Sequence, residues 1–183
     1  MKINIIRSSR RTICVEIRSG ELTVRAPQTA SDADIESFLA KNRQKIEKHI
    51  TKVTEAEKKL ADVPVLTEDE LDALTAEAKK AIPPRVRYYA ALIGVEYGRI
   101  TVRRQKTRWG SCSAKGDLSF NCLLMLAPSE ALDSVIVHEL CHRKEMNHSK
   151  RFYAQIARVF PDYAKWRRWL KDNGPALIKR LPE

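Results

Sequence analysis

No stretch of the sequence approaches the roughly 20 consecutive apolar residues that a membrane-spanning helix requires. The first residues, from Met1 to Arg7, alternate apolar and polar side chains as a strand does. They contain neither the apolar segment nor the small-residue cleavage site of a signal peptide. Internal repeats and low-complexity segments are also missing from the 183 residues. We therefore expect a cytoplasmic protein that does not associate with a membrane.

The sequence is also poor in motifs that bind metal through cysteine or that bind phosphate. It has four cysteines, which form no CxxC pair and whose spacing suits no structural zinc knuckle: Cys14, Cys112, Cys122 and Cys141. In a reducing compartment the expected state is four free thiols. The chain has no Gly-rich phosphate loop and no carboxylate cluster suited to magnesium, which counts against a nucleotide phosphohydrolase.

Negative charge is scarce relative to positive charge. The chain has 34 Lys and Arg against 23 Asp and Glu, a formal net charge of +11. Such a balance attracts polyanions, and the basic residues cluster at 41–45, 103–108 and 165–169. The other charges are spread along the chain, which equally fits a basic surface that only keeps the protein in solution. The composition thus leaves both nucleic acid or nucleotide binding and a plain solvated surface open.

What the sequence does contain is a concentrated set of histidines. Three of its four histidines lie between residues 138 and 148, and Glu139 directly follows the first. His138 and His142 are four residues apart, so on a helix they project from one face, about 40° apart around the axis. Both imidazoles can then reach one metal ion, with Glu139 beside a metal-bound water. The preceding apolar residues 132–137 would bury the helix and hold the histidines rigid.

A third metal ligand is needed, and two residues compete for the position. Glu145 follows His142 by three residues and could still lie on the helix, while His148 follows it by six. We favour His148, because Met146 and Asn147 can leave the helix and Asn tolerates the left-handed conformation of such a turn.

This ligand set predicts a particular chemistry. Three neutral imidazoles leave tetrahedral zinc with one open position for water, whose pKa falls to about 7. Glu139 would activate that zinc-bound water as a general base and then pass the proton to the leaving amine. The sequence therefore predicts a zinc metallopeptidase acting on peptides or proteins. The alternatives are a zinc-dependent hydrolase of a non-peptide substrate such as a nucleotide, and a non-catalytic nucleic-acid adaptor, which would not need Glu139.

Periodicity and turn residues predict an α+β fold. Strands are expected over 3–7, 12–18, 22–26, 99–104 and 118–126, with a turn at Ser19-Gly20. A first helix is expected from Ser31 to about Leu60. A second is expected from a Thr67–Glu70 capping box to Gly94, with an interruption at Pro83-Pro84. Further helices are expected from Ser129 through the histidines and over 149–160 and 161–171, and Asn173-Gly174-Pro175 is expected to end the last one. We expect a small N-terminal sheet with a long helix in residues 1–65, and the catalytic domain in 66–183.

A second distinctive stretch is Arg108-Trp109-Gly110-Ser111-Cys112-Ser113. Gly110 and the serines suit a tight turn, and an exposed strand edge nearby could hold an extended peptide. Arg108 could stabilise an oxyanion, or it could bind carboxylates or carbonyl groups within the fold. Trp109 suits the core better than a substrate platform.

Together with Phe120-Asn121, the 138–142 motif and His148-Ser149-Lys150-Arg151-Phe152, this stretch resembles the YgjP-like metal-dependent hydrolases, relatives of the SprT-type and Wss-type metallopeptidases. The resemblance implies a minimal zincin-like (gluzincin-type) core with a short sheet packed on the HExxH helix, a zinc cofactor, and His138, His142 and His148 as ligands. Tyr153 stands where the family usually has Trp. Arg108, Asn121 and Tyr153 are candidates for contacts with the substrate or the transition state. Some relatives cleave proteins crosslinked to DNA, so a protease acting on DNA-bound proteins is a further alternative.

Overall fold

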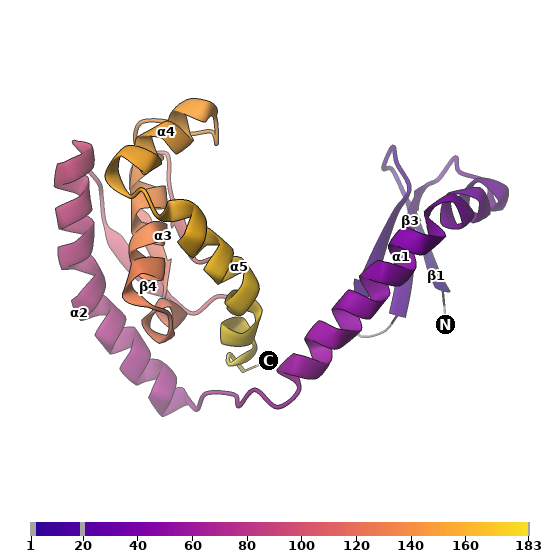
Figure 1. Cartoon of the computed structure of the whole chain (residues 1–183), viewed down its shortest axis with the longest axis horizontal. Helices are drawn as coiled ribbons and strands as arrows, with labels where there is room; N and C mark the ends of the chain where they lie inside the picture. The colour runs from indigo at the N-terminus through magenta and orange to yellow at the C-terminus, as the bar shows by residue number, and fades with distance from the viewer. Residues whose placement is uncertain (1–2, 19–20, 183) are drawn as a thin grey trace. The chain divides into compact units, whose positions relative to one another are not determined.

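The computed structural model describes residues 3–18 and 21–182 (Figure 1). Contacts between Cα atoms divide the chain into two units, Met1–Asp62 and Val63–Glu183. Among the described residues, none of the helices combines the length and the apolar character needed to cross a membrane. The mixture of small sheets and helices is the α+β class that the sequence predicts.

The N-terminal unit is a three-stranded sheet with one helix. Strands β1 (Ile3–Ser8), β2 (Cys14–Arg18) and β3 (Glu21–Pro27) lie in the order β1-β3-β2, with β1 parallel and β2 antiparallel to β3. Alternation along β3 buries Val24 and Ala26, which pack with Ile35 of helix α1 (Asp32–Leu60). The predicted strands are confirmed, whereas the expected Ser19-Gly20 turn lies outside the described residues.

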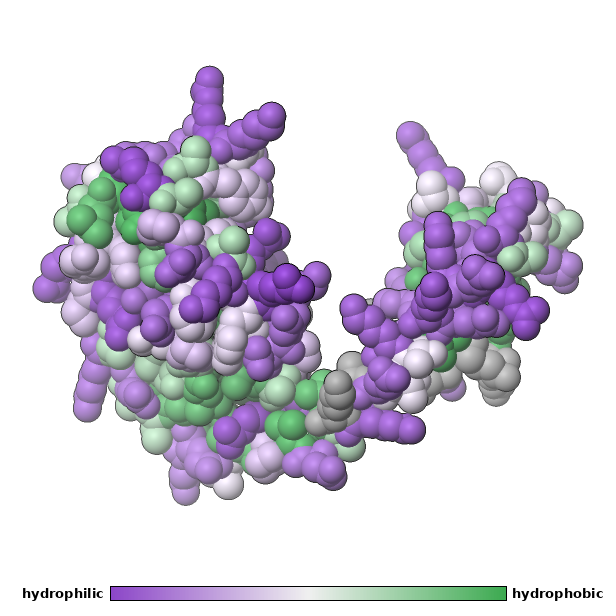
Figure 2. All heavy atoms as spheres, viewed as in Figure 1, coloured by the Kyte–Doolittle hydropathy of each residue, from purple (hydrophilic) through white to green (hydrophobic). Residues whose placement is uncertain are grey.

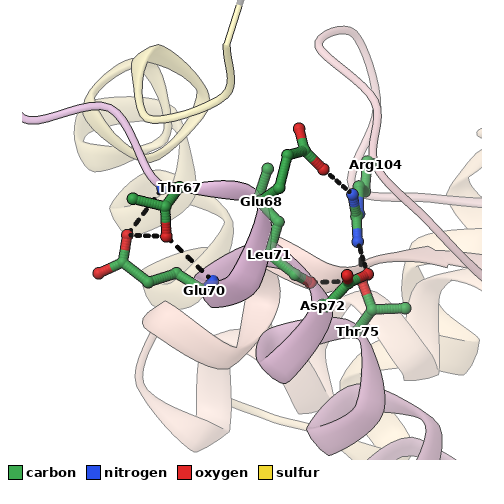
Figure 3. Close-up of polar contacts among 7 residues, drawn as sticks. All are labelled: Thr67, Glu68, Glu70, Leu71, Asp72, Thr75 and Arg104. Carbon is green, nitrogen blue, oxygen red and sulfur yellow. Dashed lines mark hydrogen bonds and ion pairs between the residues drawn. The ribbon is translucent and has the colours of Figure 1, made fainter.

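Helix α2 (Glu68–Ile93) opens the second unit and begins at the predicted capping box. The Glu70 N–H donates to Oγ1 of Thr67 at 3.2 Å, and the Thr67 N–H donates to the Glu70 carboxylate at 2.8 Å (Figure 3). Two backbone donors that have no partner within the helix are thereby satisfied. The helix ends, as predicted, at Gly94.

The predicted interruption at Pro83-Pro84 is wrong, because α2 continues through both prolines. Proline lacks an N–H and crowds the carbonyl four residues earlier, which normally breaks a helix. Here the apolar stripe runs on from one side of the prolines to the other: Ala78, Ile82 and Val86 are all fully buried. Burial of that continuous stripe outweighs the local cost of the two prolines.

A second three-stranded sheet lies in the same unit. Strands β4 (Ile100–Arg103), β5 (Gly110–Cys112) and β6 (Leu118–Asn121) lie in the order β4-β6-β5, with β4 parallel and β5 antiparallel to β6. The predicted strand over 118–126 is therefore too long. Strand β6 ends at Asn121. The Asn121 side chain accepts the N–H of Leu123 at 3.1 Å and so starts the 3-10 helix η1 (Cys122–Leu126). The expected turn at Gly110 is instead the start of β5.

Arg104, which directly follows β4, joins this sheet to the start of α2 (Figure 3). Its guanidinium donates to the Glu68 carboxylate at 2.8 Å and also to Asp72, and it lies 3.4 Å from Oγ1 of Thr75. Part of the basic 103–108 stretch is thus neutralised within the fold. The hydrophilic side chains visible in Figure 2 are spread over both units.

Three helices complete the second unit: α3 (Ser129–Cys141), α4 (Lys150–Val159) and α5 (Tyr163–Lys179). Helix α3 lies between α2 and α5 (Figure 1) and also contacts β5 and α4. The short sheet therefore packs on the helix that carries the histidine motif, as expected.

The predicted end of the last helix at Asn173-Gly174-Pro175 is wrong, since α5 runs on to Lys179. Gly174 is buried against the indole of Trp109: a Cβ atom at Gly174 would lie 2.9 Å from Cζ2 of Trp109. This glycine therefore allows a close approach between α5 and the segment before β5, and does not terminate the helix.

Candidate metal centre and active site

Helix α3 carries the histidine motif into the core. Its apolar residues are almost entirely buried, which fixes the helix between its neighbours: Leu132, Val135, Ile136, Val137 and Leu140. The helix ends at Cys141 with His142 as its C-cap, still at helical φ and ψ. Arg143 and Glu145 then close a turn by donating their N–H groups to the carbonyls of Leu140 and Cys141. The helix therefore stops earlier than the expected exit at 146–147.

The three predicted histidine ligands are brought together. One nitrogen from each of His138, His142 and His148 lies within 4.8 Å of the others. Nε2 of His138 lies 3.3 Å from Nε2 of His142 and 3.1 Å from Nε2 of His148. Two nitrogens bound to one tetrahedral zinc ion at about 2.0–2.1 Å lie about 3.3 Å apart. The two Nε2–Nε2 distances from His138 are therefore close to those expected around one zinc ion.

The opposite nitrogens of two rings are occupied by other groups. Nδ1 of His138 lies 2.7 Å from the Tyr163 hydroxyl, and Nδ1 of His142 lies 3.2 Å from the main-chain carbonyl of Glu145. A carbonyl can only accept, so Nδ1 of His142 carries the proton and its Nε2 is left with a lone pair. If His138 is to present Nε2 to a metal, it must take the same tautomer, and its Nδ1–H then donates to the oxygen of Tyr163. Glu145, the rival third ligand, thus contributes its carbonyl here, and its carboxylate is not part of the cluster.

Burial keeps His138 neutral. The pKa of His138 is lowered to about 4, and burial is the largest cause. The nearby charges of His142, His148 and Arg167 lower it further. Burial also lowers the pKa of His142. Neutral imidazole is the form that binds metal, so both rings are in the correct protonation state near neutral pH.

Phe152 supports the cluster from α4. Its fully buried ring lies with its centroid 5.0, 4.7 and 4.8 Å from those of His138, His142 and His148. The Ser149 side chain caps α4 by accepting the N–H of Phe152, and so holds this residue at the start of the helix. Neither Phe152 nor Tyr163 was recognised as a site residue from the sequence. Phe152 did stand in the quoted motif, whereas no local pattern marked Tyr163.

Glu139 lies beside the cluster and is only 6% exposed. Burial raises the pKa of Glu139 to about 7, although the Arg108 guanidinium and a hydrogen bond with the Cys112 backbone act in the opposite direction. Gly110 leaves the space that this side chain occupies, because a Cβ atom there would lie 2.8 Å from both Cγ and Oε1 of Glu139. The carboxylate is therefore held in place by β5 and α3 together.

A cavity of about 370 Å³ opens beside these groups. It is lined by residues of the segment before β5, of α3 and of α5: Thr107, Arg108, Trp109, Gly110, Ser134, Val135, His138, Glu139, Tyr163, Arg167, Leu170 and Lys171. Arg108, one of the candidate contact residues, thus lines the cavity. Trp109 both lines the cavity and packs against the core.

The other two candidate contact residues do not line this cavity. Asn121 is fully buried and does not line the cavity. Its amide donates to the carbonyls of Gln105 and Arg108 at 2.6 and 3.0 Å, so it holds the backbone of the segment that carries Arg108. Tyr153 is 37% exposed and lies beside His148 and under the Arg167 guanidinium. Both residues support groups at the site and do not line its cavity.

The cysteines stay outside the cluster. Cys141, between two of the histidines in sequence, is buried, and burial raises its pKa to about 11, so it remains a thiol packed beside the site. All four cysteines are free, as predicted. His49 is exposed on α1 and is not part of the cluster.

A known protein family matches most of the second unit. Residues 66–173 match the profile of the YgjP-like family, described as YgjP-like, metallopeptidase domain. No curated protein sequence matches the chain. Two solved structures are similar over half of it: the metallopeptidase zymogen jannalysin of Methanocaldococcus jannaschii (TM-score 0.45, 21% identity, 50% of this chain and 94% of that one) and abylysin of Pyrococcus abyssi (TM-score 0.44, 22% identity, 49% and 91%). The family description names a metallopeptidase domain and no nucleic-acid partner.

Proposed function

The chain belongs to the YgjP-like metallopeptidase family, and on this basis we propose that it is a zinc peptidase with Glu139 as its general base. Family membership makes it a metal-dependent peptidase acting on peptides or proteins. The identity of the metal, the ligands and the roles of individual residues are our proposal. The observation that carries it is the convergence of three Nε2 atoms beside a buried carboxylate at the wall of a cavity.

Zinc is the metal that this ligand set suits best. Three imidazoles, from His138, His142 and His148, each presenting Nε2, match the three-ligand centres of catalytic zinc sites. Among the described residues, no carboxylate oxygen, the kind of ligand that calcium and magnesium prefer, belongs to the cluster. When bound, zinc would supply a Lewis acid that polarises the scissile carbonyl and acidifies water.

Glu139 provides the proton transfers. A carboxyl group with a pKa of about 7 can both accept and release a proton near neutral pH, as a general base that later acts as an acid must. It would take the proton from the attacking water and deliver it to the nitrogen of the leaving amine. Its fixed position against Gly110 keeps the carboxylate oriented toward the cavity.

The edge of β5 offers a binding surface for the substrate backbone. In the order β4-β6-β5, this strand pairs on one side only, and its first residue, Gly110, lines the cavity. An extended peptide can add to such an edge through main-chain hydrogen bonds, which place it without regard to its sequence. Arg108 precedes this strand and lines the same cavity, and we assign it to contact the carbonyl oxygen at which negative charge develops.

We assign catalysis to residues 66–183 and treat residues 1–65 as an appendage of unassigned role. A cytoplasmic location suits the four free thiols, since disulfides are rare in reducing compartments.

The test is the Glu139→Gln variant, assayed with zinc-loaded protein on a peptide library. Loss of general acid–base catalysis should lower turnover by about 10²–10⁴-fold. The variant should keep its zinc and its circular dichroism spectrum, because Gln has nearly the shape of Glu and all three histidines remain. Undiminished hydrolysis in this variant would rule out Glu139 as the base. Hydrolysis of nucleotides but of no peptide by the wild type would reassign the substrate.

A further inference from the structure

The cavity beside the histidines carries an excess of positive charge. Its charged lining residues are Glu139, which we assign to catalysis, and the cations Arg108, Arg167 and Lys171. The ion pairs found between described residues include none of these three cations. Arg108 also acts on the Glu139 carboxylate, whereas Arg167 and Lys171 form no ion pair among the described residues. Cations of this second kind favour a ligand that brings its own negative charge.

Two of the cations are placed by the periodicity of α5. Tyr163, Arg167 and Lys171 are spaced by four residues, so they project from one face of the helix, and all three line the cavity. The Tyr163 hydroxyl contacts His138 at 2.7 Å. With a rise of about 1.5 Å per residue, Arg167 and Lys171 follow about 6 and 12 Å further along the axis. The charges therefore form a line that leads away from the metal centre.

This spacing can be compared with that of a peptide. An extended chain advances about 3.3–3.6 Å per residue. The two cations on α5 therefore lie within reach of positions roughly two to four residues from the cleaved bond. Leu170, which lies between them in the sequence, also lines the cavity and can give the stem of a substrate side chain an apolar contact.

The neighbouring cation on the same helix has a different environment. Arg168 does not line the cavity, and its side chain is 84% exposed and lies 3.9 Å from Asp172. Arg167, in contrast, is placed over the Tyr153 ring with its Cζ atom 5.9 Å from the ring centroid. The structure thus provides two adjacent arginines, of which only one faces the cavity.

We propose, on the basis of the peptidase function above, that this cavity selects substrates with a carboxylate within about four residues of the cleaved bond. Arg167 and Lys171 are the specificity-determining residues. The carboxylate can come from an Asp or Glu side chain or from the C-terminus of the substrate, and the experiment distinguishes the two sources.

The experiment uses peptides of one parent sequence. Glu or Gln is placed at each of the four positions on either side of the cleaved bond, and a second pair ends in a free acid or an amide. For a carboxylate that meets both cations, we expect kcat/KM to be about five- to tenfold higher than for its neutral counterpart, since partly exposed ion pairs are modest. The preference should fall at 0.5 M salt because the charges are screened. If the carboxylate comes from a side chain, the preference appears between the Glu and Gln peptides. If it comes from the C-terminus, the preference appears between the free-acid and amide peptides.

Variants then connect the preference to the two cations. The double variant Arg167→Gln, Lys171→Gln should bring the acid-to-neutral ratio close to one. The control Arg168→Gln removes one positive charge from the same helix outside the cavity, and it should leave the ratio as in the wild type. Equal cleavage of all matched pairs by the wild type, or an equal fall of the ratio in the control, would overturn the proposal.

A binding measurement separates this proposal from the peptidase assignment. The same peptides, fluorescently labelled, are titrated into the Glu139→Gln variant with and without the double substitution on α5. One outcome is that the wild type cleaves no peptide while acidic peptides bind the Glu139→Gln variant more tightly through Arg167 and Lys171. In that case the peptidase assignment fails, and the selection of carboxylates by the two cations stands as a binding preference. If peptides are cleaved and bound without an acid preference, carboxylate selection fails alone. Tighter binding of a single-stranded oligonucleotide than of any acidic peptide, lost in the same double variant, would assign the cations to nucleic acid and overturn the proposal.

Discussion

Gly174 and Trp109, 65 positions apart in the chain, are in direct contact: a Cβ atom at Gly174 would lie 2.9 Å from Cζ2 of the Trp109 indole. Trp109 lines the cavity and packs against the core, so it cannot move freely. Gly174→Ala should therefore strain this contact and destabilise the protein by about 1–3 kcal/mol, as overpacking does. The gain in helix propensity, about 0.5–1 kcal/mol, would offset part of the loss.

Urea denaturation of the zinc-free protein would measure this change without a contribution from metal binding. Asn173→Ala is the matched control, since Asn173 is exposed on the same helix, and its free energy of unfolding should change by no more than about 0.5 kcal/mol. A Gly174→Ala variant more stable than the wild type would show that the indole yields without cost.

Metal content should distinguish His148 from Glu145. The nitrogen of His148 faces the other two histidines, whereas Glu145 offers only its main-chain carbonyl to His142. Zinc per chain, measured by atomic emission after dialysis, should be close to one in the wild type and in Glu145→Ala. It should fall to near zero in His148→Ala. The reverse pattern would show that the third ligand is the carboxylate.

Tyr163→Phe should weaken zinc binding and leave the fold intact. The hydroxyl that contacts Nδ1 of His138 orients this ring, and loss of such a partner typically lowers metal affinity about 10–100-fold. Affinity can be measured by competition with a chromophoric chelator. Tyr153→Phe serves as the control, because Tyr153 stacks near His148 but makes no hydrogen bond to a histidine in the described structure. Equal affinities in Tyr163→Phe and the wild type would assign the tyrosine a packing role only.

The features that the sequence predicted well are those encoded by neighbouring residues. The Thr67–Glu70 capping box and the spacing of His138 and His142 each lie within one helical turn or two, so a short pattern suffices to place them. The fold class and the family followed from such local motifs as well.

The features that it missed depend on partners distant in the chain. Tyr163 contacts His138 from 25 residues away, and nothing around it signals that contact. Asn121 was grouped with the substrate contacts, although its amide is used entirely within the fold. Gly174 and Pro83 suggested helix ends because their local preferences are clear, but packing against distant residues overrides those preferences. A short sequence pattern cannot reveal packing contacts of this kind, because the contacting residues lie far apart in the chain.

Gly110→Ala should lower activity while the metal site remains intact. A Cβ atom at this position would lie 2.8 Å from Cγ and Oε1 of Glu139 and 2.9 Å from Cγ1 of Val135. Because contacts under about 3 Å cannot persist between such atoms, the Glu139 carboxylate must shift away from β5. A displacement of about 1 Å in a catalytic group can cost about 10²-fold in rate. The three histidines lie outside this contact, so zinc content should stay near one per chain.

The measurement is kcat on the best library peptide, together with zinc per chain for the same preparation. Ser111→Ala, in the next position of β5, is the control, because it changes the strand without adding an atom against Glu139. Full activity in Gly110→Ala would mean that the carboxylate can act from more than one position. Loss of zinc along with activity would mean that the change disturbs α3 itself, and Glu139→Gln would then remain the only clean test of the base.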